Sequence, residues 1–111
     1  MTPKRSKSTY LQGTVEVLVL KLLTRGPLHG YGIAKQLAEE TDGVVELEDA
    51  ALYQGLHRME SKGWIEAEWG RSETGRRAKL YRLTDAGRKL LRAETEGFRD
   101  FASAVLKVLE T

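Results

Sequence analysis

The sequence contains no cysteine, and only two histidines among its 111 residues. Without cysteine the chain can form neither a disulfide nor a zinc ribbon, and it has no thiol for catalysis. The two histidines, His29 and His57, are far apart and have no cysteine to complete a ligand set, so we expect no metal site. The lack of cysteine also fits a cytoplasmic protein.

Long hydrophobic runs are missing as well. The longest, Val17–Leu20, is far shorter than the roughly 20 residues needed to cross a bilayer. The basic N-terminus is followed by no continuous apolar core and no small-residue cleavage site, so we expect neither a signal peptide nor contact with a membrane. No Ser/His/Asp grouping in a Gly-rich turn and no phosphate-cradling loop is present. We therefore expect one globular domain that is not an enzyme and needs no cofactor.

Charge is unevenly distributed, although the formal net charge is only +2. Residues 1–25 carry five basic side chains and one acidic, and residues 64–92 carry eight and four. Residues 26–63 between them carry three basic and seven acidic side chains. Two basic segments in a weakly charged chain favour a field directed at a polyanion, although surface lysines and arginines also serve solubility.

Helical periodicity begins near Tyr10. Apolar residues recur at helical spacing and spread over more than one side, so a helix over residues 10–25 is predicted to pack on two partners, one of them from another subunit. The repeat consists of Leu11, Val15, Leu18 and Leu22. Gly26-Pro27 ends this helix, and a second helix is predicted from Gly30 to about Thr41. Residues 44–47 are predicted to be a short extended piece that pairs with later strands.

A third helix is predicted over DAALYQGLHRMES, with Asp49 as its N-cap and Gly63 as its stop. Its inner stripe consists of Leu52, Leu56 and Met59. Its outer face is small at first and then polar, with Ala50, Gln54, His57 and Ser61 flanked by Tyr53 and Arg58. Such a face suits entry into a DNA major groove, but an ordinary amphipathic surface helix has the same pattern.

After Gly63 the period drops to two. The runs WIEAEW and AKLYRLT alternate polar and apolar residues and are joined by GRSETGRR, which predicts a β-hairpin. Its tip and return strand carry Arg71, Arg76, Arg77 and Lys79. A basic hairpin after a helix with a polar outer face is typical of a winged helix, in which the helix enters the major groove and the wing contacts the backbone or minor groove.

The last helix is predicted to begin after Thr84 and to run to the C-terminus. A coiled-coil-like seam is formed by Leu91, Phe98, Phe101, Val105 and Val108. Glu94 falls on this seam and Gly97 is expected to interrupt the helix. A terminal helix with so much apolar surface is interpreted as a dimerisation helix; the alternative is that it packs back on its own domain.

Four segments together closely resemble the PadR-like transcriptional regulators: LQGTVEVLVLKLL, GPLHGYGIAKQL, ALYQGLHRMESKGWIEAEW and RRAKLYRLTDAGRKLL. The resemblance implies a homodimeric winged helix-turn-helix repressor that releases DNA when a small effector binds. The chain resembles the short form of the family, which has a single C-terminal helix. Similar members bind planar apolar compounds at the dimer interface, which implies a candidate effector pocket at Leu11, Val15, Leu18, Phe98 and Phe101. Two departures are Gln54, where the family commonly has proline, and the absence of tryptophan from the last helix.

We thus predict a mainly α fold with a small β-hairpin wing (α+β). A flexible basic arm is expected at residues 1–9, a winged helix-turn-helix domain at residues 10–84 and a C-terminal dimerisation helix at residues 85–111. The expected partners are a double-stranded DNA operator, a second copy of the chain, and an apolar or aromatic effector. The expected DNA contacts are Tyr31, Tyr53, Gln54, His57, Arg58, Ser61, Arg71, Arg76, Arg77 and Lys79.

The alternative is a winged helix that contacts protein and no longer binds DNA. It is favoured by the acidic residues Glu46, Glu48, Asp49 and Glu60, which lie before and within the third helix. The basic wing argues against it.

Overall fold

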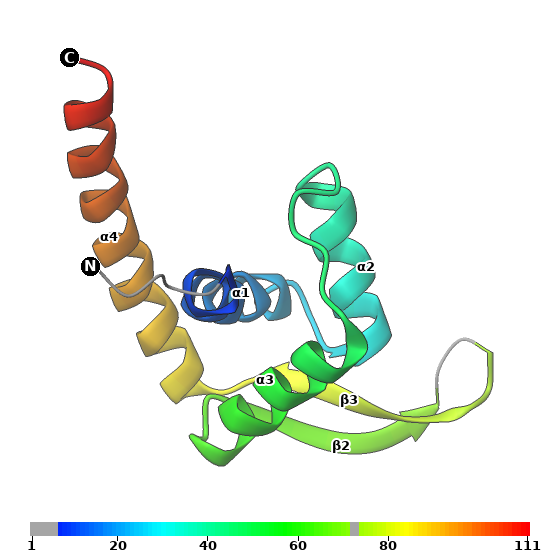
Figure 1. The fold of residues 1–111 in the computed structure, drawn as a ribbon. Coiled ribbons are helices and arrows are strands. Elements are labelled where there is room, and N and C mark those ends of the chain that lie inside the picture. The colour runs from blue at the N-terminus through cyan, green and yellow to red at the C-terminus, as the bar shows by residue number, and fades with distance from the viewer. Residues whose placement is uncertain (1–6, 72–73) are drawn as a thin grey trace.

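Four helices and a small antiparallel sheet make up the computed structural model, which describes residues 7–71 and 74–111, with side chains described from Thr14 onward (Figure 1). The elements are α1 (Lys7–Leu23), β1 (Leu28–His29), α2 (Gly30–Glu40), α3 (Asp49–Ser61), β2 (Ile65–Arg71), β3 (Arg77–Leu83) and α4 (Asp85–Leu109). The predicted α+β fold with a hairpin wing is confirmed. Of the expected basic arm, residues 1–6 lie outside the described residues, and residues 7–9 belong to α1.

The sheet has the order β1-β3-β2, and its strands are antiparallel. The predicted hairpin pairs β2 with β3, from Ile65 opposite Leu83 to Arg71 opposite Arg77. The third strand is not the segment that we expected: β1 pairs with β3, whereas residues 44–47 form no strand. That segment instead follows a turn in which the Thr41 hydroxyl accepts a hydrogen bond from the Val45 N–H at 2.9 Å.

Helix α1 lies in the middle of the molecule, where α2, α3, α4 and β3 all contact it (Figure 1). This arrangement explains why its apolar residues occupy more than one side. The buried core that results consists of Val19, Leu20, Leu22, Leu23, Ile33, Leu37, Leu52, Leu56, Met59, Ile65, Tyr81 and Leu91. The three residues predicted for the inner stripe of α3 are all in this core, so the outer face of that helix is fixed toward solvent.

The ends of α3 and α4 are joined through Thr84. Its hydroxyl donates to the Gly63 carbonyl at 2.6 Å and accepts from the Gly87 N–H at 3.0 Å, which confirms Thr84 as the N-cap of α4. Gly63 ends α3 with a φ of +80°, as expected. The predicted cap of α3 is displaced by one residue, because Glu48 is the N-cap and Asp49 is the first helical residue. Asp49 still lies where a carboxylate complements the helix dipole.

Helix α4 continues through Gly97 without a break, contrary to our expectation. A single glycine weakens a helix by about 1 kcal/mol but leaves its backbone hydrogen bonds intact. The first part of α4 packs on the domain, since Leu91 is only 9% exposed and belongs to the core and not to an outer seam. Further along, Phe98, Phe101, Val105 and Val108 are all exposed.

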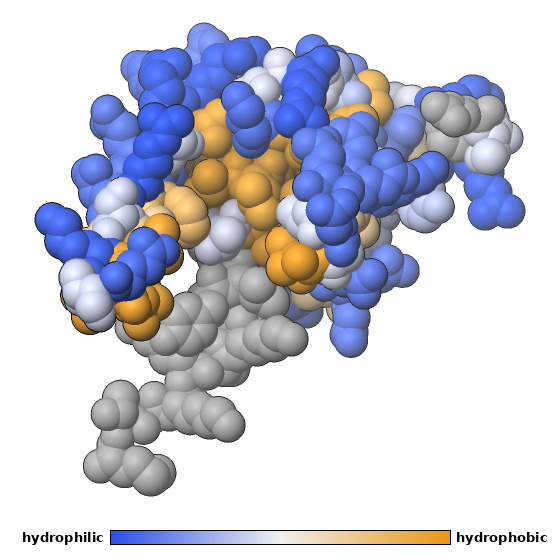
Figure 2. Space-filling model, turned by 90° about the horizontal axis from the view of Figure 1, so that it is seen from above, coloured by the Kyte–Doolittle hydropathy of each residue, from blue (hydrophilic) through white to orange (hydrophobic). Residues whose placement is uncertain are grey.

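Seen from above, apolar surface covers the middle of the molecule and one side of the projecting end of α4, and charged residues surround it (Figure 2). The α4 stripe is defined as Phe98, Phe101, Val105, Val108 and Leu109, all exposed. A soluble chain rarely leaves so many large apolar side chains together in water. The distal half of α4 therefore has no partner within the described part of its own chain.

Candidate nucleic-acid interface

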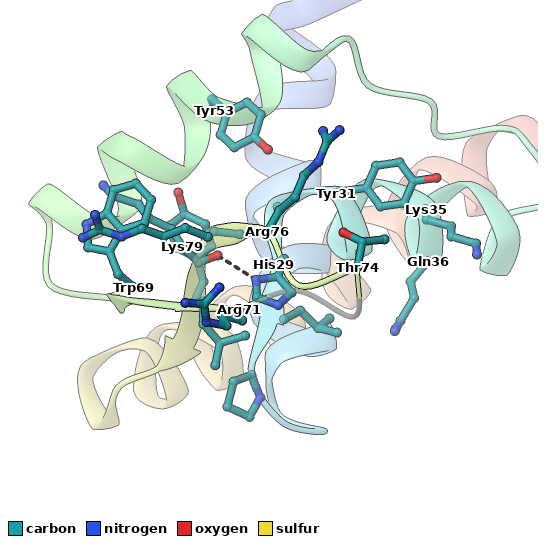
Figure 3. A pocket seen from close by; sticks show the side chains of 18 of the residues that line it. His29, Tyr31, Lys35, Gln36, Tyr53, Trp69, Arg71, Thr74, Arg76 and Lys79 are labelled. Carbon is teal, nitrogen blue, oxygen red and sulfur yellow. Dashed lines mark hydrogen bonds between the residues drawn. The ribbon is translucent and has the colours of Figure 1, made fainter.

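A cleft of about 1240 Å³ lies between α2, α3 and the wing, which is the hairpin of β2 and β3 (Figure 3). Seven of the ten side chains predicted to contact DNA line it: Tyr31, Tyr53, His57, Arg71, Arg76, Arg77 and Lys79. They come from α2, α3 and the wing, which are separated along the chain. The structure therefore brings the helix and the wing to one continuous surface.

The cleft is electropositive. Its lining includes five cationic side chains, Lys35, Arg71, Arg76, Arg77 and Lys79, and two carboxylates, Glu39 and Glu60. Arginine presents forked N–H donors that match phosphate oxygens, and lysine supplies a compact point charge. A surface with this balance can neutralise several phosphates of a nucleic-acid backbone.

Four cations of the wing have contacts that fix their positions. Lys79 lies opposite Trp69 in the hairpin, and its Nζ is 3.8 Å from Glu60 Oε1 on α3. Arg77 lies over the Trp69 ring, with its Cζ 4.6 Å from the ring centroid. Arg71 Nη1 donates to the Gly75 carbonyl at 3.0 Å. Arg82 is on the opposite face of the hairpin, where it pairs with Glu68.

Helix α2 meets the cleft at its N-terminus. His29 Nδ1 donates to the Lys79 carbonyl at 3.2 Å, so this histidine has a structural role in joining β1 to β3. A Cβ on Gly30 would lie 2.8 Å from the Tyr53 ring, which shows how closely that ring rests on the first turn of α2. Tyr31 is exposed. Its hydroxyl is accessible to a ligand.

Tyr81 lies at the floor of the cleft and is buried. Burial raises the pKa of its hydroxyl, and the charges of Glu60 and Tyr53 raise it further. Tyr81 therefore remains neutral and supports the packing of β3 while the charged side chains surround the opening.

The other three predicted contacts lie outside the cleft. Gln54 and Ser61 are exposed on α3, and the Ser61 hydroxyl donates to the His57 carbonyl at 2.9 Å. Arg58 is turned toward α1, where Nε and Nη2 donate to Glu16 Oε1 at 2.8 and 2.5 Å. This ion pair is partly buried, since the side chains of Arg58 and Glu16 are 37% and 16% exposed. Arg58 thus joins α1 to α3 and does not extend the outer face.

The sequence reasoning missed Lys35 and Trp69. Lys35 follows Tyr31 by one helical turn and lies on the same face of α2, a spacing that could have revealed it. Trp69 occupies an apolar position in the alternating pattern of β2, which indicates only that it is on the inward side of the strand. The wing extends beyond the core at this point, so the ring is 58% exposed beside the cleft.

Among residues 7–71 and 74–111, no three side chains of histidine, cysteine, aspartate or glutamate are grouped as a metal site. None of the helices described has the length and apolarity needed to span a bilayer.

A helical core that presents an exposed polar helix beside a basic hairpin defines a winged-helix DNA-binding protein. Residues 19–93 match the model of the transcriptional regulator PadR-like family. The chain belongs to this family, and it is therefore a DNA-binding transcriptional regulator and not an enzyme.

Solved structures agree with this assignment. The chain is similar to a transcriptional regulator from Clostridium thermocellum, with 30% identity, a TM-score of 0.81, and coverage of 90% of this chain and 97% of that one. It is also similar to a PadR family transcriptional regulator from Eggerthella lenta, with 35% identity, a TM-score of 0.78, and coverage of 93% and 88%. A Lysinibacillus sphaericus protein named Uncharacterized protein X is 29% identical over 85 residues, which are 77% of this chain and 78% of that protein.

Proposed function

We propose that this regulator is a homodimeric repressor that binds a double-stranded DNA operator and is released by a small apolar or aromatic effector. The observation that carries the proposal is the basic cleft, which unites α2, α3 and the wing around five cationic side chains. We propose that the regulator acts in the cytoplasm.

In the proposed complex, α3 enters the major groove. Gln54 and His57 are exposed on α3 and face the base edges, where an amide can form a bidentate pair with adenine. The DNA backbone beside them lies in the cleft and meets Lys35, Arg71, Arg76, Arg77 and Lys79. The hydroxyls of Tyr31 and Tyr53 fix the register through phosphate contacts, and Ser61 flanks the end of the helix.

The proposed dimer forms when the α4 stripe covers the same stripe of a second copy. Val15 and Leu18 of α1 are half-buried, and α1 contacts α4, so covering the stripe encloses an apolar space between these helices. Leu11, the remaining predicted pocket residue, lies outside the residues whose side chains are described. An effector held by Phe98 and Phe101 changes the spacing of the two α3 helices. Two half-sites require a fixed spacing, so this change releases the DNA.

The test is binding to DNA from immediately upstream of the coding region and to a shuffled duplex, over a series of salt concentrations. We expect the upstream DNA to be preferred and the affinity to fall steeply as salt rises. Arg76→Ala with Arg77→Ala should weaken binding to every sequence. It should also reduce the salt slope, which is the steepness with which the logarithm of the binding constant falls with the logarithm of salt concentration, by about 0.9 for each phosphate that is no longer neutralised. Arg82→Ala is the matched control, since it removes one cation from the opposite face of the same hairpin.

Binding with no salt slope would contradict the proposal and indicate a winged helix that contacts protein. A reduction of the salt slope in the Arg82→Ala protein by the same amount per cation removed would show that total charge matters and the cleft does not. Gln54→Ala separates base reading from backbone contact: it should change the preference between sequences, and a uniform loss of affinity would contradict the role of Gln54.

A further inference from the structure

Trp69 is a large apolar residue that is 58% exposed on β2 beside the cleft. Packing in the core does not explain why a tryptophan is at this position. On the same face of β2, the residues that pack against the core are the buried Ile65 and the half-buried Ala67, which lie nearer the body of the domain. A tryptophan so placed contributes little to the core. Its contacts with the neighbouring strand show what it does.

The register of the hairpin places two cations next to the ring. Trp69 lies directly opposite Lys79, and Arg77 is two residues earlier on the same face of β3. Long side chains at directly opposed and diagonal positions of a hairpin reach one another. The Arg77 Cζ is 4.6 Å and the Lys79 Nζ is 5.9 Å from the centroid of the indole ring. Both distances are within the range of cation–π attraction, and tryptophan is the strongest partner for it.

The same face also places two like charges together. Arg71 lies directly opposite Arg77, and like charges at opposed positions repel each other. Arg71 is held away by the Gly75 carbonyl, at 3.0 Å, while the Trp69 ring draws Arg77 to the other side. The Gly75 carbonyl and the Trp69 ring thus hold the two arginines in defined positions. Without these contacts, both side chains would adopt many rotamers in solvent.

We propose that Trp69 is a positioning residue of the wing, whose ring holds Arg77 and Lys79 at the cleft before DNA arrives. The proposal rests on the DNA-binding role of the cleft given above. A side chain that is already held in place loses less conformational freedom when it contacts a phosphate, so the complex is tighter for the same number of charges. Trp69 therefore affects affinity without contributing to counterion release.

Two substitutions separate the ring's electrostatics from its size. Trp69→Phe keeps an aromatic face with a weaker attraction for cations, and Trp69→Leu keeps an apolar side chain without one. In the protein without DNA, NMR should show the Arg77 Cδ protons shifted upfield by the ring current in wild type, less so in the Phe variant and not in the Leu variant. Arg77 shifts that are equal in wild type and in the Leu variant would overturn the proposal.

Operator binding over the salt series then tests the consequence. Trp69→Leu should weaken binding by about five- to thirtyfold, the effect expected for two exposed cation–π contacts, with Trp69→Phe between it and wild type. The salt slope should stay that of wild type, whereas Arg77→Ala with Lys79→Ala should lower it by about 0.9 for each phosphate left without its cation. In that double-alanine background, Trp69→Leu should change affinity by less than about twofold, because the ring no longer has cations to hold.

Four further results would overturn the inference. A full Trp69→Leu effect in the double-alanine background would mean that the ring itself contacts DNA. A matching fall in thermal stability and in affinity for every DNA would mean that the ring only supports the hairpin. A Leu variant that binds as tightly as wild type would refute this inference alone, whereas a wild-type protein that binds no DNA would refute it together with the proposed function.

Discussion

Gly87 and Gly97 are ten residues apart in α4 and have opposite surroundings. A Cβ on Gly87 would lie 2.1 Å from the Trp64 carbonyl oxygen and 2.7 Å from Leu83 Cδ1, because α4 begins directly against the end of the hairpin. A Cβ on Gly97 would meet nothing within 4 Å. Neither glycine has a positive φ, so packing alone distinguishes them.

We therefore expect one substitution to have opposite effects at the two sites. Gly87→Ala should destabilise the fold by about 1–3 kcal/mol, the usual cost of overpacking a core. Gly97→Ala should stabilise it by up to about 1 kcal/mol, because alanine is the better helix former. Urea unfolding of both variants at one protein concentration measures the two free energies. A loss of stability at Gly97 as large as that at Gly87 would contradict the packing argument.

Single residues were the hardest features to predict from the sequence. The helical pattern placed Arg58 beside the outer face of α3, but its direction depends on Glu16, which is 42 residues earlier in the chain. Trp69 showed the same limit, since alternation identifies the inward side of a strand but not where the core ends. The cleft cations of the wing were easier to predict, because the tip of the hairpin lies away from the core and its charged side chains are exposed to solvent.

At the scale of elements, α1 connects the two ends of the molecule. It contacts α4 on one side and α3 on another, and the Glu16–Arg58 ion pair fastens it to the helix proposed to read DNA. Because Glu16 is mostly buried, removal of Arg58 leaves a carboxylate without its main partner in a poorly hydrated position.

Arg58→Ala or Glu16→Gln should each lower the free energy of unfolding by about 1–2 kcal/mol, between the effects typical of exposed and of buried pairs. The exchanged protein, Glu16→Arg with Arg58→Glu, should recover part of the loss in a double-mutant cycle. Thermal unfolding measures both. Arg25→Ala is the control: it breaks the exposed Arg25–Glu40 pair, in which the side chains are 51% and 45% accessible, and should cost less.

A different outcome would support the prediction from the sequence that Arg58 contacts DNA. If Arg58→Ala left stability unchanged but reduced operator affinity, this side chain would act on DNA and not on α1. Because Glu16→Gln keeps the arginine, it should then have no effect on binding.

Most elements could be predicted from periodicity. Helices of several turns repeat their apolar positions often enough to be recognised, and each strand of the wing has seven residues, long enough to include a run with a period of two. Strand β1 has only two residues and cannot show alternation, so it was missed. The apolar pair in residues 44–47 suggested a strand instead, but the turn after α2 directs this segment away from the sheet.

At the scale of the whole molecule, α4 extends from one end and the wing from the other, along a longest dimension of 53 Å (Figure 1). The α4 stripe lies far from the cleft, so damage to the stripe should not alter the cleft itself. This separation permits a clean test of the proposed dimer.

Phe98→Asp with Phe101→Asp should convert the protein from dimer to monomer in sedimentation equilibrium, because two charges in an apolar interface are costly to desolvate. The monomer should bind a half-site but lose at least about tenfold in affinity for the complete operator, since the two sites are no longer linked. Ser103→Asp adds a charge to the opposite side of α4 and should remain dimeric. A wild-type protein that sediments as a monomer at micromolar concentration would refute the proposed dimer.

The family and general architecture could be predicted because the motifs cover most of the chain in a fixed order. The arrangement of two copies could not be predicted, because the sequence identifies an apolar face but not the geometry of the interface that this face would form. Phe98 and Phe101 identify an apolar face, and their spacing alone does not set the angle at which two helices cross.

In the proposed dimer, the α4 stripe also makes regulation depend on how many copies of the chain a cell contains. Where most chains are single, the amount of a paired form rises with the square of the total concentration. Twofold dilution during growth and division then reduces operator occupancy more than twofold, without any signal molecule. The strength of one hydrophobic contact, far from the DNA, would thereby set the protein concentration at which the regulated gene is switched on or off.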